Sequence, residues 1–201
     1  MKTIILASKS VDRKLLFQRA KLPFEVFMIN IDEDKYKARF SNPIELVKQL
    51  AKLKALNAKE SLIKEGKDVI IISGDTIVEL NGEIIGKAKD EDNAFHILKK
   101  LAGKVHNLIT GFAITETNNS KLIVDYDSTL VKFINLQDDE IWSYIKSEEW
   151  KGRAGAYSLR EKASLFIESI QGSSSNVIGL PMHKIYKILK KEFNFDLLQY
   201  F

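Results

Sequence analysis

The 201-residue sequence predicts an α/β fold with a mixed β-sheet, because short β-branched runs alternate with segments of helical periodicity along the chain. Two segments carry most of this prediction. Val69–Val78 is apolar apart from the four residues from Ser73 to Thr76, which indicates a central strand covered on both faces. From Asn42-Pro43 to about Lys64, apolar residues recur with a period of 3.6 and predict a long amphipathic helix.

The N-terminal part of the chain predicts a strand, a helix and a second strand. Thr3–Ala7 is a short β-rich run, and Ser10 is placed to cap a helix whose apolar residues share one face as far as Ala20. Phe24–Ile31 alternates loosely between apolar and polar residues, which is typical of a strand. Pro43 suits the first turn of the long helix, because proline at that position sacrifices no helical hydrogen bond.

The remainder of the chain continues the alternation. Asn81-Gly82 is a strong hairpin signal, since both residues readily adopt the positive φ that a tight turn requires. No break in composition divides the sequence, so we expect residues 1–201 to form a single domain. The further predicted elements are a hairpin over Glu79–Ile85, helices over Asp90–Leu101, Asp138–Lys146 and Pro181–Phe193, and strands over Val105–Thr115, Leu122–Asn135 and Ser164–Ile170.

Composition excludes several classes of function. The chain has no cysteine, which removes disulfides, thiolate metal sites and cysteine nucleophiles together. The net charge is +4 and only five of the 31 cations are arginine, so we expect no nucleic-acid partner. No run approaches the roughly 18–20 apolar residues that cross a bilayer, so we expect a cytoplasmic protein without a membrane partner.

A candidate anion site lies between the first strand and the first helix. Ser8, Ser10 and Arg13 place two hydroxyls and a cation where a helix N-terminus offers free N–H groups. Hydroxyls and a cation at such a position could form a cradle for an anion. The alternative is that Ser10 merely caps the helix and that Arg13 is solvated.

Two carboxylates are candidates for a metal site. Asp75 interrupts an apolar strand, where a buried carboxylate is expensive unless it is paired, binds a metal or faces a ligand, and Gly74 allows close approach beside it. Glu33 lies in an acidic triplet at the end of the second predicted strand. Mg²⁺ takes one or two carboxylates plus phosphate oxygens, so this pair could hold it. The alternatives are a structural aspartate and a solvated turn.

Lysines and two small-residue loops complete the candidates. Lys54 falls on the apolar stripe of the long helix and Lys87 follows the hairpin, so both could contact phosphate, although either could be solvated. The loop Gly152–Tyr157, followed by Arg160, and the segment Gly172–Pro181 could bring backbone close to a ligand or could be plain turns. We expect His106, inside a predicted strand, to be a hydrogen-bonded structural residue.

In the order of its motifs the chain resembles the Maf family, the septum-formation-inhibitor-like nucleotide pyrophosphatases of the inosine-triphosphatase-like superfamily. The resemblance runs nearly from end to end and rests on six loose motifs in the family's order. They are Leu6-Ala7-Ser8-Lys9-Ser10-Val11-Asp12-Arg13, Gly74-Asp75-Thr76-Ile77-Val78, Gly86-Lys87-Ala88, Ala102-Gly103-Lys104-Val105-His106 with Thr110-Gly111, Ala154-Gly155-Ala156-Tyr157 and Asn176–Pro181.

The resemblance implies a fold and an activity. The fold is an elongated mixed β-sheet flanked by helices, with two lobes around a central cleft, commonly as a homodimer. The activity is hydrolysis of a nucleoside triphosphate between its α- and β-phosphates, supported by a divalent cation, Mg²⁺ or Mn²⁺. By the resemblance, Asp75 is the catalytic base and Glu33 a further metal ligand. The implied phosphate-binding residues are Ser8, Ser10, Arg13, Lys54 and Lys87.

Three positions bear on the choice of base. Family members that prefer dTTP and UTP carry Arg, Thr and Gln where this chain has Asp12, Thr76 and Arg160. Only Thr76 agrees, so a pyrimidine, 7-methyl-GTP or another modified nucleotide remains open as the substrate. A different class of function also remains open, namely a nucleotide-binding regulator of cell division with little turnover.

Overall fold

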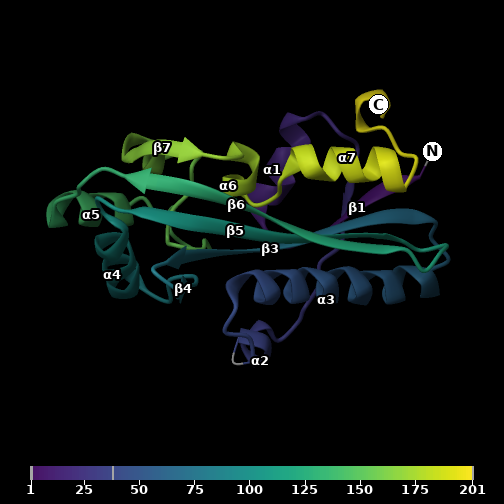
Figure 1. Cartoon of the computed structure of the whole chain (residues 1–201), viewed down its shortest axis with the longest axis horizontal. Helices are drawn as coiled ribbons and strands as arrows, with labels where there is room; N and C mark the ends of the chain where they lie inside the picture. Colours follow the sequence, from purple (N-terminus) through teal and green to yellow (C-terminus); the bar gives the residue numbers. More distant parts are fainter. Residues whose placement is uncertain (1, 38, 201) are drawn as a thin grey trace. The chain divides into compact units, whose positions relative to one another are not determined.

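The computed structural model of the protein describes residues 2–37 and 39–200. Within them, seven strands form one mixed sheet in the order β2-β1-β3-β5-β6-β7, with β4 paired to β3 (Figure 1). β1 pairs in parallel with β2 and β3, whereas the β3–β4 and β6–β7 pairs are antiparallel. The prediction of an α/β fold with a helix-flanked mixed sheet is confirmed. The strands are β1 (Thr3–Ala7), β2 (Glu25–Val26), β3 (Val69–Leu80), β4 (Glu83–Ile85), β5 (Val105–Glu116), β6 (Leu122–Phe133) and β7 (Ile167–Gln171).

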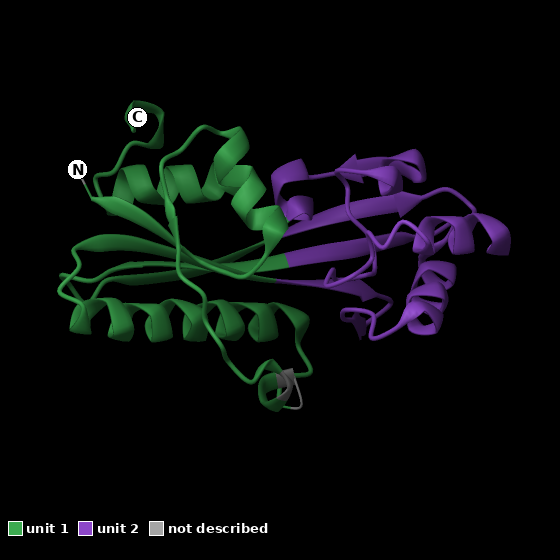
Figure 2. Cartoon of the chain, turned by 180° about the vertical axis from the view of Figure 1, so that it is seen from behind, with its two compact units in different colours: residues 1–75, 110–127, 179–201 green, residues 76–109, 128–178 purple. Residues whose placement is uncertain are grey.

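The chain divides into two compact units, coloured separately in Figure 2. Unit 1 comprises residues 1–75, 110–127 and 179–201, and unit 2 comprises residues 76–109 and 128–178. Strands β3, β5 and β6 each contribute residues to both units. Both units are therefore assembled from segments that are far apart in the sequence.

In unit 1 the sheet is covered by helices on both faces. Figure 1 shows α3 (Pro43–Lys64) along one face and α1 (Val11–Arg19) and α7 (Met182–Glu192) on the other. The short helix α2 (Glu33–Lys37) precedes α3, and the 3₁₀ helix η2 (Leu197–Gln199) follows α7. Because strands β1 and β3 are covered on both sides, their side chains are buried almost throughout.

Helix α3 is specified by its own sequence and then fixed to the sheet. The Asn42 side chain accepts hydrogen bonds from the first free N–H groups of the helix, and Pro43 occupies its first turn. The Ser73 hydroxyl of β3 donates to the Ala51 carbonyl at 2.7 Å. At Gly111 of β5 the helix comes so close that a Cβ would lie 2.4 Å from the Val47 carbonyl. The helix therefore lies directly on the sheet, with little room to shift.

Unit 2 has its own apolar core. The β3–β4 hairpin turns at Asn81 and Gly82, whose φ values are 52° and 85°, as the sequence predicted. Phe133, Trp150 and Phe166 are buried in one apolar cluster with residues of β3, α4 and α5. Its remaining helices are α4 (Glu91–Leu101), α5 (Asp138–Ile145), α6 (Ser174–Ile178) and the 3₁₀ helix η1 (Lys162–Leu165).

Four sequence predictions need correction. The strand predicted over Phe24–Ile31 is two residues long, because Ile29 and its neighbours bury against the core without continuing the strand pairing. Glu33 begins helix α2 instead of ending a strand. The strand predicted from Ser164 starts later, at Ile167, after a 3₁₀ turn. The buried face of α1 includes Phe17, whereas Ala20, which was predicted to lie on that face, is exposed just after the last residue of the helix. Helix α6 lies inside the segment Gly172–Pro181, for which the sequence predicted no helix.

Candidate active site

One ammonium group joins the two candidate metal-binding carboxylates. Lys54 Nζ donates to Asp75 Oδ1 at 2.6 Å and lies 2.7 Å from Glu33 Oε1. The side chains of Lys54 and Asp75 are 12% and 11% exposed, and that of Glu33 is 28% exposed. The structure therefore brings together three residues that the sequence named separately, in a site that is mostly shielded from water.

Three elements of unit 1 supply these groups. Lys54 lies on α3, on the side that packs toward the sheet, and Asp75 lies on the central strand β3. Glu33 is the first residue of α2, which contacts α3. Since Ser73, two residues before Asp75, is itself bonded to α3, helix and strand are held in fixed register at this point.

The structure also brings together Ser8, Ser10 and Arg13, the residues expected to form an anion cradle. Ser10 is the N-cap of α1, and its Oγ accepts a hydrogen bond from Arg13 N at 3.3 Å. Ser8 Oγ accepts from Ser10 N and from Arg13 Nη1, both at 3.2 Å. The two hydroxyls and the guanidinium therefore form one hydrogen-bonded group at a helix N-terminus, which is the local environment that favours an anion.

Arg13 is buried and fixed, not solvated. Only 8% of it is exposed, and Arg13 Nε donates to the Gly179 carbonyl at 2.8 Å. Burial lowers the pKa of Arg13 from its ordinary value, while the negative charges of Asp75 and Glu33 act in the opposite direction. The carboxylates of Asp75 and Glu33 therefore favour the charged form of the Arg13 guanidinium.

Gly74 explains how Arg13 can lie beside β3. A Cβ at this position would lie 2.8 Å from Leu180 Cδ2, 3.2 Å from Arg13 Nε and 3.3 Å from the Gly111 carbonyl oxygen. The sequence predicted close approach at Gly74 by a ligand or by backbone. In the structure the space is taken by the chain's own groups, so the glycine packs Arg13 next to Asp75.

The Gly179 carbonyl holds the Arg13 side chain, a contact that the sequence did not indicate. It belongs to the small-residue segment Gly172–Pro181, which the sequence left open between a turn and a ligand-contacting loop. Gly179 has φ 126°, a conformation that favours glycine. The glycine at this position was the signal in the sequence. Its hydrogen-bond partner, Arg13, lies 166 residues away and could not be predicted from local patterns.

Unit 2 contains three further candidate residues, Thr76, Lys87 and Arg160. Asp12 lies in unit 1, in the first turn of α1. Lys87 is exposed, and its backbone forms an isolated antiparallel bridge with Ala154. Arg160 N donates to Ser158 Oγ at 3.5 Å. His106 is buried and hydrogen-bonded, as predicted: its Nε2 lies 2.9 Å from Tyr157 Oη.

The donor set of the Lys54 cluster fits a hard divalent cation. Glu33 and Asp75 offer carboxylate oxygens to one point, where Lys54 now supplies the positive charge. Among the described residues no cluster of three or more His, Cys, Asp or Glu could hold a metal by itself. A pair of carboxylates that leaves further positions to phosphate oxygens and water is the arrangement that Mg²⁺ commonly takes.

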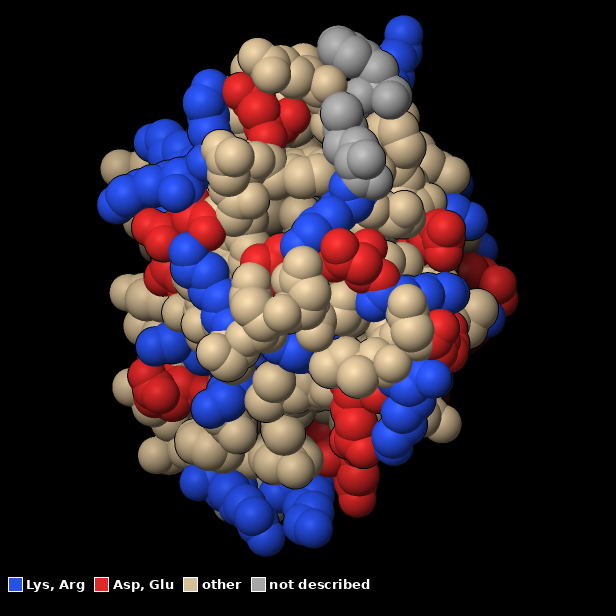
Figure 3. Space-filling model, turned by 90° about the vertical axis from the view of Figure 1, so that its right-hand side faces the viewer, with Lys and Arg blue, Asp and Glu red and all other residues tan. Residues whose placement is uncertain are grey.

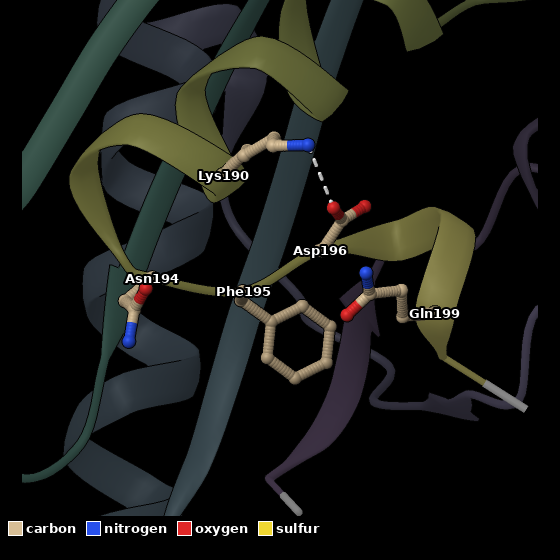
Figure 4. A pocket seen from close by; sticks show the side chains of 5 residues that line it. All are labelled: Lys190, Asn194, Phe195, Asp196 and Gln199. Carbon is tan, nitrogen blue, oxygen red and sulfur yellow. Dashed lines mark ion pairs between the residues drawn. The ribbon is translucent and has the colours of Figure 1, made fainter.

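A pocket at the end of α7 is lined by none of the candidate site residues. It has a volume of about 400 Å³ and contains an ion pair of 2.8 Å between Lys190 and Asp196 (Figure 4). On the face shown in Figure 3, cationic and anionic side chains are interspersed. Among the described residues, no helix combines the length and hydropathy of a membrane span. The pocket is lined by Lys190, Asn194, Phe195, Asp196 and Gln199.

Comparison with known families gives one match over most of the chain. The model of the family described as Maf-like protein matches residues 3–192. This range includes every candidate site residue in both units.

Individual proteins of similar sequence carry a common name. The dTTP/UTP pyrophosphatase of Alkaliphilus oremlandii is 45% identical over 198 residues, covering 98% of this chain and 100% of that protein. The dTTP/UTP pyrophosphatase of Ruminiclostridium cellulolyticum is 38% identical, covering 95% and 96% of the two chains. That of Clostridium tetani is 41% identical, covering 93% and 96%. Each similarity spans nearly the full length of both proteins.

Proposed function

This chain belongs to the Maf family, and on that premise we propose that it is a nucleoside triphosphate pyrophosphatase acting on dTTP and UTP. Its relatives at 37–45% identity over nearly the full chain are named for this activity. The observation that carries the proposal to particular residues is the cluster in which Lys54 joins Glu33 and Asp75, next to the cradle of Ser8, Ser10 and Arg13.

The reaction splits the bond between the α-phosphorus and the oxygen that bridges it to the β-phosphate. A water oxygen forms the new bond to the α-phosphorus, and the products are a nucleoside monophosphate and pyrophosphate. Asp75 accepts the proton that the water loses, which is the role of a general base. Such a reaction needs no protein nucleophile, in agreement with a chain that has no cysteine.

The cations hold the triphosphate and offset its charge. Arg13 and the two serines bind phosphate oxygens at the start of α1, where the helix N-terminus favours negative charge. Lys54, released from one of its carboxylates, and Lys87 bind further phosphate oxygens. Groups that are already oriented stabilise the charge that develops during hydrolysis better than solvent does.

Glu33 and Asp75 would hold a divalent cation, Mg²⁺ or Mn²⁺, which supplies charge neutralisation of the triphosphate when bound.

The choice of base would be set by contacts of the nucleotide with Thr76, Asp12 and Arg160. The names of the relatives favour the pyrimidine alternative that the sequence left open. We further propose that the chain acts as a cytoplasmic homodimer, on the strength of its family resemblance.

The test is a screen for pyrophosphate release over the common and modified nucleoside triphosphates, with Mg²⁺ or Mn²⁺. We expect turnover of dTTP and UTP and little turnover of the purine nucleotides. Clear nucleotide binding with no turnover of any nucleotide would contradict the enzymatic function and favour the nucleotide-binding regulator. Turnover limited to 7-methyl-GTP or another modified nucleotide would retain the activity and contradict the substrate.

A further inference from the structure

Unit 2 contains a buried polar pair that the proposed reaction does not use. His106 on β5 is 2% exposed and Tyr157 is 4% exposed, and their Nε2 and Oη atoms share a hydrogen bond of 2.9 Å. Both rings lie edge-on to Phe133, with centroids 4.8 Å away in each case. Within the described residues, His106 Nδ1 has no hydrogen-bond partner. A polar pair is thus kept inside an aromatic cluster, at some expense in desolvation.

Tyr157 ends a tight loop with unusual backbone geometry. Gly155 and Ala156 both have positive φ, 70° and 59°, and Ala156 N donates to the Arg153 carbonyl at 3.2 Å. Positive φ is unfavourable for alanine, so the surrounding contacts must impose this conformation. A Cβ on Gly155 would lie 2.8 Å from Val78 Cγ2 and 3.0 Å from the Tyr157 ring. The ring of Tyr157 therefore packs directly against the turn that it follows.

The same loop fixes the backbone of Lys87. Ala154 forms the antiparallel bridge with Lys87, and Gly155 N donates to the Gly86 carbonyl at 3.0 Å. The Lys87 side chain is exposed, so these backbone contacts are what set the place from which it extends. A continuous series of contacts thus leads from His106 through Tyr157 and the loop to Lys87.

We propose that His106 and Tyr157 are positioning residues for Lys87, acting through the Arg153–Tyr157 loop. This inference rests on the proposed function, in which Lys87 binds the triphosphate. An aromatic ring alone would fill the space, whereas the hydrogen bond also fixes the ring's orientation, which determines how the loop meets residues 86 and 87. Burial lowers the pKa of His106 to about 4, so the pair keeps the same protonation throughout the neutral range.

The first test is a pair of double-mutant cycles. Tyr157→Phe keeps the ring and removes the hydroxyl, and we expect kcat/KM to fall about fivefold, the effect of one hydrogen bond. In a Lys87→Ala background the same change should have little further effect, because its target is gone. In a Lys54→Ala background it should again give about fivefold. An equal loss in both backgrounds, or no loss in the wild type, would overturn the proposal.

The second test does not depend on turnover. Amide hydrogen exchange at Gly155, whose N–H bonds to Gly86, should be about fivefold faster in Tyr157→Phe. Tyr200→Phe, a buried tyrosine in unit 1, is the matched control and should leave Gly155 unchanged. An unchanged Gly155 amide in Tyr157→Phe overturns the positioning role whatever the activity. A wild-type chain without turnover would instead contradict the proposed function.

Discussion

Lys54 on helix α3 and Asp75 on strand β3 form an ion pair of 2.6 Å, and Glu33 lies 2.7 Å from the same ammonium group. Two carboxylates that share one cation repel each other when the cation is removed. The lysine therefore stabilises the local structure in addition to the phosphate contact proposed for it, and both roles can be measured.

Replacing the cation should weaken the fold and make it responsive to Mg²⁺. In Lys54→Met, we expect the free energy of unfolding to fall by about 2 kcal/mol, because two mostly shielded carboxylates lose their counter-charge. Added Mg²⁺ should then raise the melting temperature more than it does in the wild type. Lys64→Met, which alters an exposed lysine of the same helix, is the control. Equal Mg²⁺ effects in all three proteins would argue against a cation site at this cluster.

Removing the negative charge at Asp75 should stop the reaction without unfolding the chain. Asp75→Asn keeps the side-chain shape, and we expect kcat to fall at least about 100-fold, as for a lost general base. Pyrophosphate release measures the rate. Asp68→Asn, at an exposed aspartate next to the start of the same strand, should be nearly normal. Near-normal turnover of Asp75→Asn would remove this residue from the mechanism.

The contact between Gly111 and α3 should be sensitive to a single methyl group. In Gly111→Ala the new Cβ would meet backbone atoms of Val47 and Lys48 at 2.4–2.6 Å, so the helix must move. We expect a loss of about 2 kcal/mol in denaturant unfolding, together with lower kcat, because α3 carries Lys54. Gly86→Ala is the stability control, since its Cβ would meet no atom within 4 Å. Similar stability losses in both variants would show that the close packing at Gly111 is not the cause.

His106 should make stability depend on pH. Its pKa is about 4 in the folded protein, lowered by burial from an ordinary value of 6.5. Between these values the unfolded chain binds a proton that the folded chain does not, so stability falls as the pH decreases from 6.5 to 4. The loss at the lower end is about 3 kcal/mol. His106→Gln removes the titrating group, and the difference between wild-type and variant unfolding free energies across this range measures the effect. A difference independent of pH would contradict it.

The elements that the sequence predicted well are those specified by local signals. Helix α3 has its cap at Asn42, its proline and its apolar period within one segment, and it begins and ends where the sequence placed it. The position of Lys54 on the apolar stripe was also informative, since that lysine is largely buried. Local patterns carry such information because caps and helical faces depend on residues a few positions apart.

The errors lie where long-range contacts decide. The alternation from Phe24 to Ile31 reflects burial: Phe27, Ile29 and Ile31 pack on a core that includes Leu62, but strand pairing stops after Val26. Likewise, nothing local indicates that Glu33, Lys54 and Asp75 meet. Their proximity depends on how α2 packs on α3 and α3 packs on the sheet, which is a property of the tertiary structure. The roles given to these residues remain predictions for the experiments above.

The division of the chain into units has a consequence for its biosynthesis. Unit 1 includes residues 179–201, so its last segment leaves the ribosome only after every residue of unit 2 has been made. Until then, Arg13 has neither the Gly179 carbonyl that accepts its hydrogen bond nor the packing of Leu180 beside Gly74. A nascent or truncated chain ending before residue 179 therefore has the residues of the anion cradle but lacks the contact that orients its guanidinium. Ser8, Ser10 and Arg13 therefore reach the arrangement seen in the structure only after unit 2 has been translated.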